Sequence, residues 1–341
     1  MTQLALFTRL LDDASPAGRY ALALAQIQEA ERVGLDRAWV AQHHFRAAEG
    51  GLPSPFVFLA HAAAATRGIR LGTGVVTLTL EDPVRVAEDA VVLDLLSGGR
   101  LDLGLGSGGT PTSFAPFGLR LDDKTAVYEA KLETLLTALR GGDVGGGNTL
   151  YPDAGALGDR VWQATFSAAG GVRAGSHGHG LLLSRTQPRP DDRPEASLAE
   201  LQEPIVDAYL AALPSGVRGT VTASRTVFVA DDRAEARAFA ETGLRRAARS
   251  FRGGRLSPDA DLDELILASD THVGTPEEVA ASLAADPTLA RADEVAFQVH
   301  SVDAPHAHVL RSIELFATEV APALGWSSAA SAPPITTGGH A

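Results

Sequence analysis

IRLGTGVVTLTLEDPVRVAEDAVVLDLLSGGRLDLGLGSGG, residues 69–109, contains one complete strand–helix–strand unit. The first run of β-branched and other apolar residues, 69–78, predicts a strand. Apolar residues at helical spacing predict a helix over 82–99, and a second apolar run predicts a strand over 100–109. Because a helix lies between them, the two strands are expected to be parallel neighbours in one sheet.

The ends of the predicted helices carry residues that favour helix initiation and termination. Asp82 can cap the helix that it begins, Pro83 suits the first turn, and Gly98 suits the end. Ser54 and Pro55 have the same arrangement at the start of an earlier helical run. These signals predict where helices start more sharply than hydrophobic periodicity does.

The same alternation of strand-like and helical runs continues through most of the chain. The further predicted strands cover 4–10, 37–44, 161–166, 181–184, 222–230 and 293–301, and the further predicted helices cover 20–34, 54–68, 124–142, 195–213, 232–251 and 306–324. These six strands and the two of the first unit make eight. Eight parallel strands with intervening helices are what a closed (β/α)8 TIM barrel requires, and 341 residues accommodate it with loop insertions.

Loop insertions are expected where the alternation is lost. Residues 141–159 are rich in glycine, 186–197 are rich in proline and charge, and 252–272 are only weakly periodic. We therefore predict an α/β fold, a single (β/α)8 barrel domain over 1–326. Residues 327–341 are predicted to form a flexible C-terminal tail.

The composition excludes several classes of function. The 29 Lys and Arg residues face 42 Asp and Glu residues, and the net charge of −13 predicts neither nucleic-acid nor membrane partners. The absence of cysteine excludes thiolate chemistry, and the His-Gly-His sequence at 177–179 lacks further ligands, so no metal site is predicted. Without a basic leader or an apolar stretch near the ~20 residues of a membrane span, the predicted compartment is the cytoplasm.

In a (β/α)8 barrel, functional residues gather at the carboxyl ends of the strands. AWVAQHHF, residues 38–45, ends a predicted strand with His43 and His44. Two interpretations fit this pair: hydrogen-bonded histidines that close the barrel mouth, or catalytic imidazoles. Other strand ends carry polar or small residues, namely Thr77, Gly106, Ser107, Ser184, Arg185, Gln298 and His300.

A first glycine-rich segment, GLGSGG at 104–109, satisfies the spacing of a dinucleotide-binding fingerprint. That fingerprint must open a helix directly, whereas Pro111 and Pro116 interrupt the segment that follows. The segment is not a Walker A loop, which ends in Gly-Lys-Ser/Thr. It is not a nucleophile elbow either, because Leu105 stands where the first glycine belongs.

A second glycine-rich segment, FSAAGGVRAGSHGHG at 166–180, is a better candidate for anion binding. It follows a predicted strand and offers Ser167, Gly170 and Gly171, whose backbone N–H groups could point at a phosphate at a helix start. Arg173 adds a positive charge. A flexible strand–helix turn is the alternative interpretation.

At larger scale, GLDRAWVAQHHF at 34–45 and the segment 68–109 resemble the bacterial luciferase-like monooxygenase family of flavin-dependent enzymes. The resemblance covers 4–120 and resumes at 161–185 and 273–321. It implies a (β/α)8 barrel that binds reduced FMN, supplied by a separate NAD(P)H-dependent flavin reductase, or in one branch the deazaflavin F420. It further implies that O2 adds to the flavin at C4a and that the peroxide oxidises a small organic substrate.

Carried over by position, the resemblance implies roles for individual residues. His43 matches the first histidine of the family's His-His pair and is predicted to act as acid/base with a pKa near neutrality, oriented by His44. Residues 73–75 match a segment with a non-proline cis peptide bond, between Gly74 and Val75, under the isoalloxazine ring. The predicted cofactor-binding residues are Thr73, Gly74, Val75, Thr77, Gly106, Ser107, Ser167, Gly170, Gly171 and Arg173.

The chain also departs from the family pattern. Gln42 stands where a glutamate commonly precedes the histidine pair, Ser107 replaces a phosphate-binding basic residue of the light-emitting branch, and Gly106 replaces that branch's reactive thiol. These differences argue against bioluminescence and against an aldehyde substrate. An F420-dependent oxidoreductase, a non-catalytic flavin-binding subunit and a Rossmann-type NAD(P) dehydrogenase remain as alternatives.

Members of this family pair through early helices, and the chain has apolar residues to match. Val91, Val92, Leu95 and Leu135 lie on the helices predicted before and after the strand at 100–109, in excess of one barrel-facing stripe. A homodimer with a two-fold interface is therefore predicted.

Overall fold

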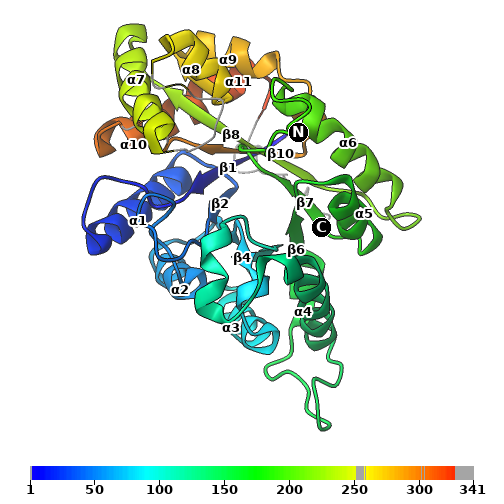
Figure 1. Ribbon diagram of the computed structural model, residues 1–341. Helices are drawn as coiled ribbons and strands as arrows, with labels where there is room; N and C mark the ends of the chain where they lie inside the picture. Colours follow the sequence, from blue (N-terminus) through cyan, green and yellow to red (C-terminus); the bar gives the residue numbers. More distant parts are fainter. Residues whose placement is uncertain (1, 251–256, 258, 301, 303, 327–341) are drawn as a thin grey trace, which may run out of the picture.

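A closed ring of parallel strands forms the centre of the computed structural model, with helices around its outside (Figure 1). The structure describes residues 2–250, 257, 259–300, 302 and 304–326. The predicted tail, 327–341, lies outside these residues, as do the last residues of the predicted helix 232–251 and strand 293–301.

The strands are β1 (Gln3–Thr8), β2 (Arg37–Val40), β3 (Arg70–Thr73), β4 (Val76–Thr77), β5 (Leu101–Gly106), β6 (Val161–Ala164), β7 (Gly180–Leu183), β8 (Val221–Val229), β9 (Thr271–Gly274) and β10 (Glu294–Gln298). The helices are α1 (Pro16–Arg32), α2 (Pro55–Ala65), α3 (Pro83–Ser97), α4 (Lys124–Leu139), α5 (Ala168–Ser176), α6 (Leu198–Ala211), α7 (Arg233–Ser250), α8 (Leu262–Ala268), α9 (Pro276–Ala284), α10 (His306–Leu315) and α11 (Ala321–Ala323).

The strand order confirms the predicted (β/α)8 barrel. The order is β10-β1-β2-β3-β5-β6-β7-β8, and pairing of β10 with β8 closes the ring. Each of the eight predicted β-runs supplies one strand of this ring. The short strand β4 pairs with β5 above β3, and β9 pairs with the outer half of β8.

The helix-initiation signals were mostly correct. The Asp82 carboxylate accepts hydrogen bonds from two backbone N–H groups of α3, and Gly98 ends that helix in a left-handed conformation, φ 71°. Ser54 occupies the N-cap position of α2 without a side-chain cap bond. Helix α1 begins at Pro16, earlier than its periodicity predicted, because Ser15 caps it through the Gly18 N–H.

The segment 252–272 was wrongly expected to be a loop insertion. Its described residues contain α8 and the start of β9, and α9 follows β9 directly. Helix α8 has seven residues and β9 has four, too few for periodicity to identify them. The N-cap residues of α8 and α9, Asp261 and Thr275, each form a capping box. This local signal could have identified the two helices.

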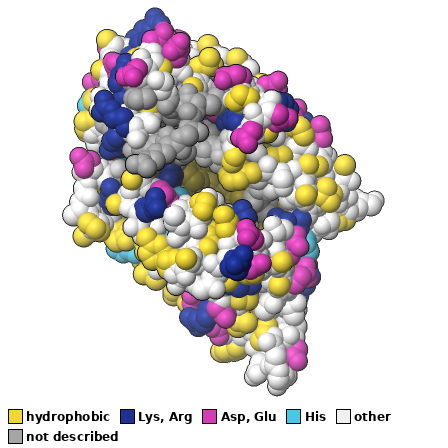
Figure 2. Space-filling model, viewed as in Figure 1, with side chains coloured by type: hydrophobic (Ala, Val, Ile, Leu, Met, Phe, Trp, Pro, Cys, Tyr) yellow, Lys and Arg dark blue, Asp and Glu magenta, His cyan; other side chains and the backbone are white. Residues whose placement is uncertain are grey.

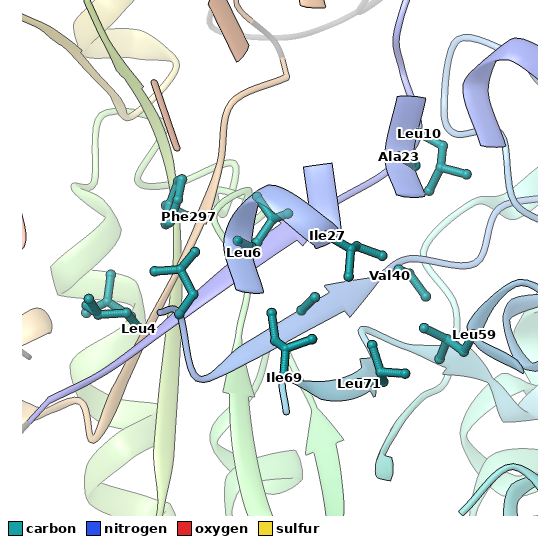
Figure 3. Packing of buried hydrophobic residues seen from close by; sticks show 14 of the residues in the cluster. Leu4, Leu6, Leu10, Ala23, Ile27, Val40, Leu59, Ile69, Leu71 and Phe297 are labelled. Atoms are coloured by element: carbon teal, nitrogen blue, oxygen red, sulfur yellow. The ribbon is translucent and has the colours of Figure 1, made fainter. Parts of the chain in front are cut away.

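Alternate strand residues face outward and pack under the helices. Figure 3 shows Leu6, Val40 and Leu71 of three neighbouring strands with Ile27 of α1 and Leu59 of α2. All five belong to one cluster of buried apolar residues. This layer fixes the helices on the barrel and leaves the inward-facing positions to set the interior.

The prediction about surplus apolar residues was partly wrong. Val91 and Leu135 are buried in this apolar layer, because they face the barrel. Val92 and Leu95 are exposed on α3, as is Leu96, which is 69% exposed. The surplus apolar surface therefore lies on one face of α3 alone.

The lower interior of the barrel, near the amino ends of the strands, holds a buried cluster of charges. The Arg37 Nε atom donates to Asp102 Oδ2 at 2.8 Å, and its Nη1 atom donates to Glu294. Asp102 also accepts from Arg70 Nε at 2.7 Å, and Glu294 accepts from Trp39 Nε1 at 2.8 Å. Arg37, Asp102 and Glu294 are each at most 5% exposed. The cluster therefore joins four strands of the ring from within.

Replacing Arg37 by leucine should lower the free energy of unfolding by about 3–5 kcal/mol, because the buried Glu294 loses its counter-charge and Asp102 keeps only Arg70. Urea unfolding followed by circular dichroism measures this difference. Arg85→Leu is the matched control, since Arg85 forms ion pairs on the exposed face of α3, and it should cost no more than about 1 kcal/mol. Equal losses for the two variants would contradict a structural role for the buried cluster.

Candidate active site

The carboxyl ends of the barrel strands surround a cleft of about 2400 Å³. Figure 2 shows this face of the molecule hollowed near its centre, with hydrophobic side chains inside the recess. The predicted site residues that line the cleft are His43, His44, Gly74, Val75, Thr77, Gly106, Ser107, Ser167, Gly170 and Arg173. The barrel rule thus brings residues from distant parts of the sequence to one place.

Thr73 and Gly171 lie behind the wall of the cleft. The Thr73 hydroxyl donates to the carbonyl of Gly104 and accepts from its N–H, both at 2.8 Å, which ties β3 to β5. Gly171 packs against α6, where an added Cβ would lie 2.6 Å from the carbonyl oxygen of Ile205. Both residues therefore shape the wall rather than face a ligand.

The imidazole of His43 is held by the loop that follows it. Its backbone N–H donates to the carbonyl of Leu52 at 2.9 Å. Gly50 packs so closely on the ring that a Cβ there would lie 2.6 Å from Nδ1. This Nδ1 atom is buried and has no hydrogen bond to any described residue. The ring is therefore fixed in place with Nδ1 covered by the loop, and Nε2 is the ring nitrogen that is not buried.

The electrostatic surroundings of His43 differ from the expectation of a near-neutral pKa. Burial, together with the positive charges of Arg9 and Arg185, lowers the pKa of His43 to about 3. Burial also lowers the pKa of His44. The prediction of a pKa near neutrality was wrong, because the sequence did not reveal two guanidinium groups beside the ring. In the free protein His43 is a neutral imidazole at physiological pH.

The peptide bond between Gly74 and Val75 is cis, which confirms the prediction for this bond. Gly74 rests on Phe7 and Trp39, since an added Cβ would lie 3.0 and 3.2 Å from their side chains. Gly106 leaves room for Val75, whose Cγ2 would lie 2.6 Å from a Cβ at that position. Gly74, Val75 and Gly106 form part of the apolar lining of the cleft.

Gln42, which departs from the family pattern, has a structural role here. Its amide oxygen accepts from the Thr77 N–H at 2.7 Å, and its amide nitrogen donates to Glu81 at 2.6 Å and to the Pro53 carbonyl at 3.0 Å. These bonds connect the ends of β2 and β4. They hold Thr77 at the edge of the cleft.

The start of α5 forms another part of the cleft wall. The Ser167 hydroxyl caps the helix by accepting from the Gly170 N–H at 3.2 Å. In the described part of the chain, the N–H groups of Ala168 and Ala169 have no hydrogen-bond acceptor. A Cβ at Gly170 would overlap the Thr165 side chain, so the glycine is also required by local packing. Free N–H groups at a helix N-terminus attract anions.

Arg173 is oriented by a buried network one turn into α5. Its Nε atom donates to Gln163 Oε1 at 3.0 Å, and its guanidinium lies 4.8 Å from the ring centre of Tyr128. The amide nitrogen of Gln163 lies 3.0 Å from Nδ1 of His179. Burial lowers the pKa of His179 to about 3, so this nitrogen accepts the bond. Within the described residues, no three His, Asp or Glu side chains are grouped so that they could hold a metal ion.

Arg9 and Arg185 also line the cleft, and the predicted site did not include them. Arg9 directly follows β1, and Arg185 lies two residues beyond β7. Arg185 was recognised at a strand end but was not selected, and Arg9 lies one residue past its strand. The strand-end rule, extended by one or two residues, could have found both.

Comparisons with known proteins agree with this architecture. Residues 2–290 match the family model described as luciferase-like monooxygenase. Limonene 1,2-monooxygenase from Rhodococcus erythropolis is 28% identical over 321 residues, which cover 88% of this chain and 80% of that protein. A monooxygenase from Streptomyces bottropensis has a similar fold, with a TM-score of 0.78, 24% identity, and coverage of 94% and 99% of the two chains.

Solved structures of the same fold belong to proteins that depend on different flavins. The oxygenating constituent of 3,6-diketocamphane monooxygenase from Pseudomonas putida, solved with FMN, has a TM-score of 0.73 at 19% identity over 94% of this chain and 98% of that one. A coenzyme F420-dependent tetrahydromethanopterin reductase from Methanopyrus kandleri has a TM-score of 0.69 at 19% identity over 94% and 99%. None of the helices among the described residues is long and apolar enough to span a bilayer. The extent of the family match means that this chain belongs to the luciferase-like monooxygenase family.

Proposed function

We propose that this protein is a flavin-dependent monooxygenase that uses reduced FMN from a separate NAD(P)H-dependent reductase, together with O2, to oxidise a small organic substrate. The observation that carries the proposal is the anion-binding start of α5 beside the cleft. At about 2400 Å³ the cleft exceeds the roughly 300–1,000 Å³ of an ordinary ligand pocket, which leaves room for a flavin and a substrate together.

The residues at the start of α5 fit a phosphate monoester. Ala168 and Ala169 offer N–H groups, and the helix dipole adds partial positive charge at the same end. Ser167 and Arg173 line the cleft there, and Lys124 lies nearby with its ammonium group 3.4 Å from the Gly108 carbonyl. These groups would hold the FMN phosphate.

The apolar part of the cleft would hold the isoalloxazine ring, over Gly74, Val75 and Gly106, with Thr77 and Ser107 at its edge. When bound, reduced FMN supplies the electrons with which O2 is activated, so that one oxygen atom enters the substrate and the other leaves as water. The apolar lining excludes water from this region.

His43 would handle a proton at Nε2, because Nδ1 is buried against Gly50. As a neutral imidazole it would accept a proton at Nε2 or donate one from it, depending on the tautomer. His44 packs edge-on against Phe117 with ring centres 5.0 Å apart, which holds its ring at the edge of the cleft. A retained proton-handling group argues against a non-catalytic flavin-binding subunit.

The choice between FMN and F420 rests on the charges around the phosphate end. Glu129 and Glu133 line the cleft there, and Glu129 approaches Arg173 at 3.4 Å. The phosphate of F420 continues into a chain of glutamates, which these carboxylates would repel. FMN ends in a compact phosphate and is favoured. F420-dependent oxidoreduction is the second candidate, supported by the fold of the reductase described above.

The exposed apolar face of α3 supports a homodimer. Leu95 and Leu96 are 61% and 69% exposed, and Val57 on the adjacent helix α2 is 74% exposed. Exposed apolar side chains on neighbouring helices are typical of a protein–protein interface. A two-fold axis would bring the same face of each subunit together.

The titration of His43 gives the first prediction from the proposed function. In the flavin-free protein its imidazole should remain neutral as the pH falls through 6.5, because the lowered pKa delays protonation to about pH 3. Histidine NMR from pH 8 to 4.5 measures this, with His43→Gln to assign the signal. The same variant should lower substrate oxidation by about 10²–10⁴-fold while flavin still binds. A titration midpoint near 6.5 would contradict the expected charge state.

The phosphate site can be tested without altering the helix cap. Ser167→Asp keeps a good N-cap residue but adds a negative charge, so it should weaken FMN by at least about tenfold and leave riboflavin nearly unchanged. Fluorescence titration with FMN, riboflavin and F420 measures all three affinities. Ser197→Asp, at the N-cap of α6, is the matched control. Equal losses for FMN and riboflavin would place the phosphate elsewhere, and tighter binding of F420 than FMN would favour the second candidate.

The dimer gives a third prediction. Sedimentation equilibrium should report twice the chain mass of 35.4 kDa at micromolar concentration. Leu95→Glu should shift the protein to the monomer, because the charge enters the symmetric interface twice. Leu267→Glu, at a side chain 75% exposed on α8, should have no such effect. A wild-type monomer would refute the assembly.

A further inference from the structure

Arg9 and Arg185 lie on the side of the barrel mouth away from the proposed phosphate site. The phosphate residues follow β5 and β6, the fourth and fifth strands of the ring. Arg9 follows β1, which faces β6 across the ring. Arg185 follows β7, the neighbour of β6, but its guanidinium hydrogen-bonds to Thr226 on β8, which lies on the other side of β7 from β6. Neither guanidinium is among the groups at the start of α5 that would hold the phosphate.

The hydrogen bonds of these two arginines leave their charge uncompensated. Arg185 is 7% exposed, and its Nη1 atom donates to the neutral hydroxyl of Thr226 at 3.0 Å. Arg9 donates to the backbone carbonyl of Glu49, and its Nε atom is buried without a partner. Among the described residues, neither forms an ion pair with a carboxylate, whereas Arg189 in the same cleft is paired with Asp270 at 2.6 Å.

The electrostatic coupling of the pair agrees with this geometry. Burial, together with the charge of Arg9, lowers the pKa of Arg185 to about 9. Burial lowers the pKa of Arg9 to about 10, and the charge of Glu49 opposes this. Buried charges in proteins are normally paired, since desolvation is costly. Two adjacent guanidinium groups that form no ion pair among the described residues therefore favour an anion from outside the chain.

The surroundings indicate what kind of molecule carries that anion. The Ser224 hydroxyl lines the cleft next to Thr226 on the inner face of β8, and it is buried without a partner. Phe7, Val75 and Leu182 supply an apolar wall to the same cleft. The negative charge of Glu49 acts on Arg9 and disfavours a doubly charged ligand. A singly charged, planar group on an apolar body fits best, and guanidinium groups bind carboxylates in this way.

We propose that Arg9 and Arg185 bind a carboxylate on the organic substrate, with Ser224 as an additional hydrogen-bond donor. The proposal deepens the proposed function, because it is the monooxygenase assignment that makes this ligand the substrate. It gives the substrate class as small carboxylic acids with an apolar body. The carboxylate anchors one end of the molecule, and the apolar end extends toward the part of the cleft lined by Gly74 and Val75.

The test uses benzoate and its neutral isostere benzamide as probes on the flavin-free full-length protein, with isothermal titration calorimetry. Wild type should bind benzoate at least about tenfold more tightly than benzamide. Arg185→Gln should abolish that preference, and Arg9→Gln should reduce it and serves as a second variant if Arg185→Gln does not fold. Arg189→Gln is the matched control, because that cleft arginine already has a carboxylate partner, and it should keep the preference.

Several outcomes would overturn the proposal. Equal affinity for benzoate and benzamide would do so, as would equal effects of Arg185→Gln and Arg189→Gln. Inorganic sulfate that binds as tightly as benzoate would indicate a site for a free oxoanion instead of a substrate. If Arg185→Gln weakened reduced FMN but not benzoate, the arginine would serve the flavin. Failure of the proposed function is a separate result, since it would appear as absent FMN binding in a protein that still prefers benzoate.

Discussion

The guanidinium group of Arg37 is the point on which the barrel interior depends. It connects β2 to Asp102 on β5 and to Glu294 on β10, and Glu294 in turn accepts from Thr222 on β8 at 3.1 Å. A buried charge of this kind is tolerated only when its partners are in place. A shift of β5 by one residue would turn Asp102 outward, into the apolar layer beneath the helices, so the cluster also fixes strand register.

The tryptophan layer above this cluster positions the base of the cleft. Trp39 and Trp162 meet edge to face with ring centres 5.6 Å apart, and the Arg37 guanidinium lies 5.1 and 5.2 Å from the two rings. Gly72 and Gly180 leave the space that these rings fill, since a Cβ at either position would overlap an indole. Phe7 and Val75 pack on this layer from the cleft side. The cleft therefore has a base that is fixed by packing within the barrel.

Features that depend on local sequence patterns could be predicted from the sequence. Features that depend on contacts between residues far apart in the sequence could not. Strand ends and helix caps are local, so the barrel and the position of His43 at its mouth could be predicted. The partners of Arg37 lie 65 and 257 residues away, and nothing in a single sequence identifies them. The pKa of His43 was mispredicted for the same reason, because Arg185 is far from it in sequence. The position of Thr73 behind the cleft wall could have been predicted from strand alternation. Thr73 lies between two residues that face inward, so its own side chain faces outward.

The arginines at the two ends of the barrel differ in whether carboxylates of the chain compensate their charge. At the lower end, the charge of Arg37 is neutralised within the chain, and the result is rigidity. At the mouth, Arg9 and Arg185 lack such partners among the described residues, although the chain as a whole carries a net charge of −13. The negatively charged surface repels anions in general, whereas the two arginines at the barrel mouth attract anions small enough to enter it. The ion pairs of Arg37 stabilise the barrel that positions Arg9 and Arg185. This stability allows the barrel to maintain a positively charged binding site at its mouth.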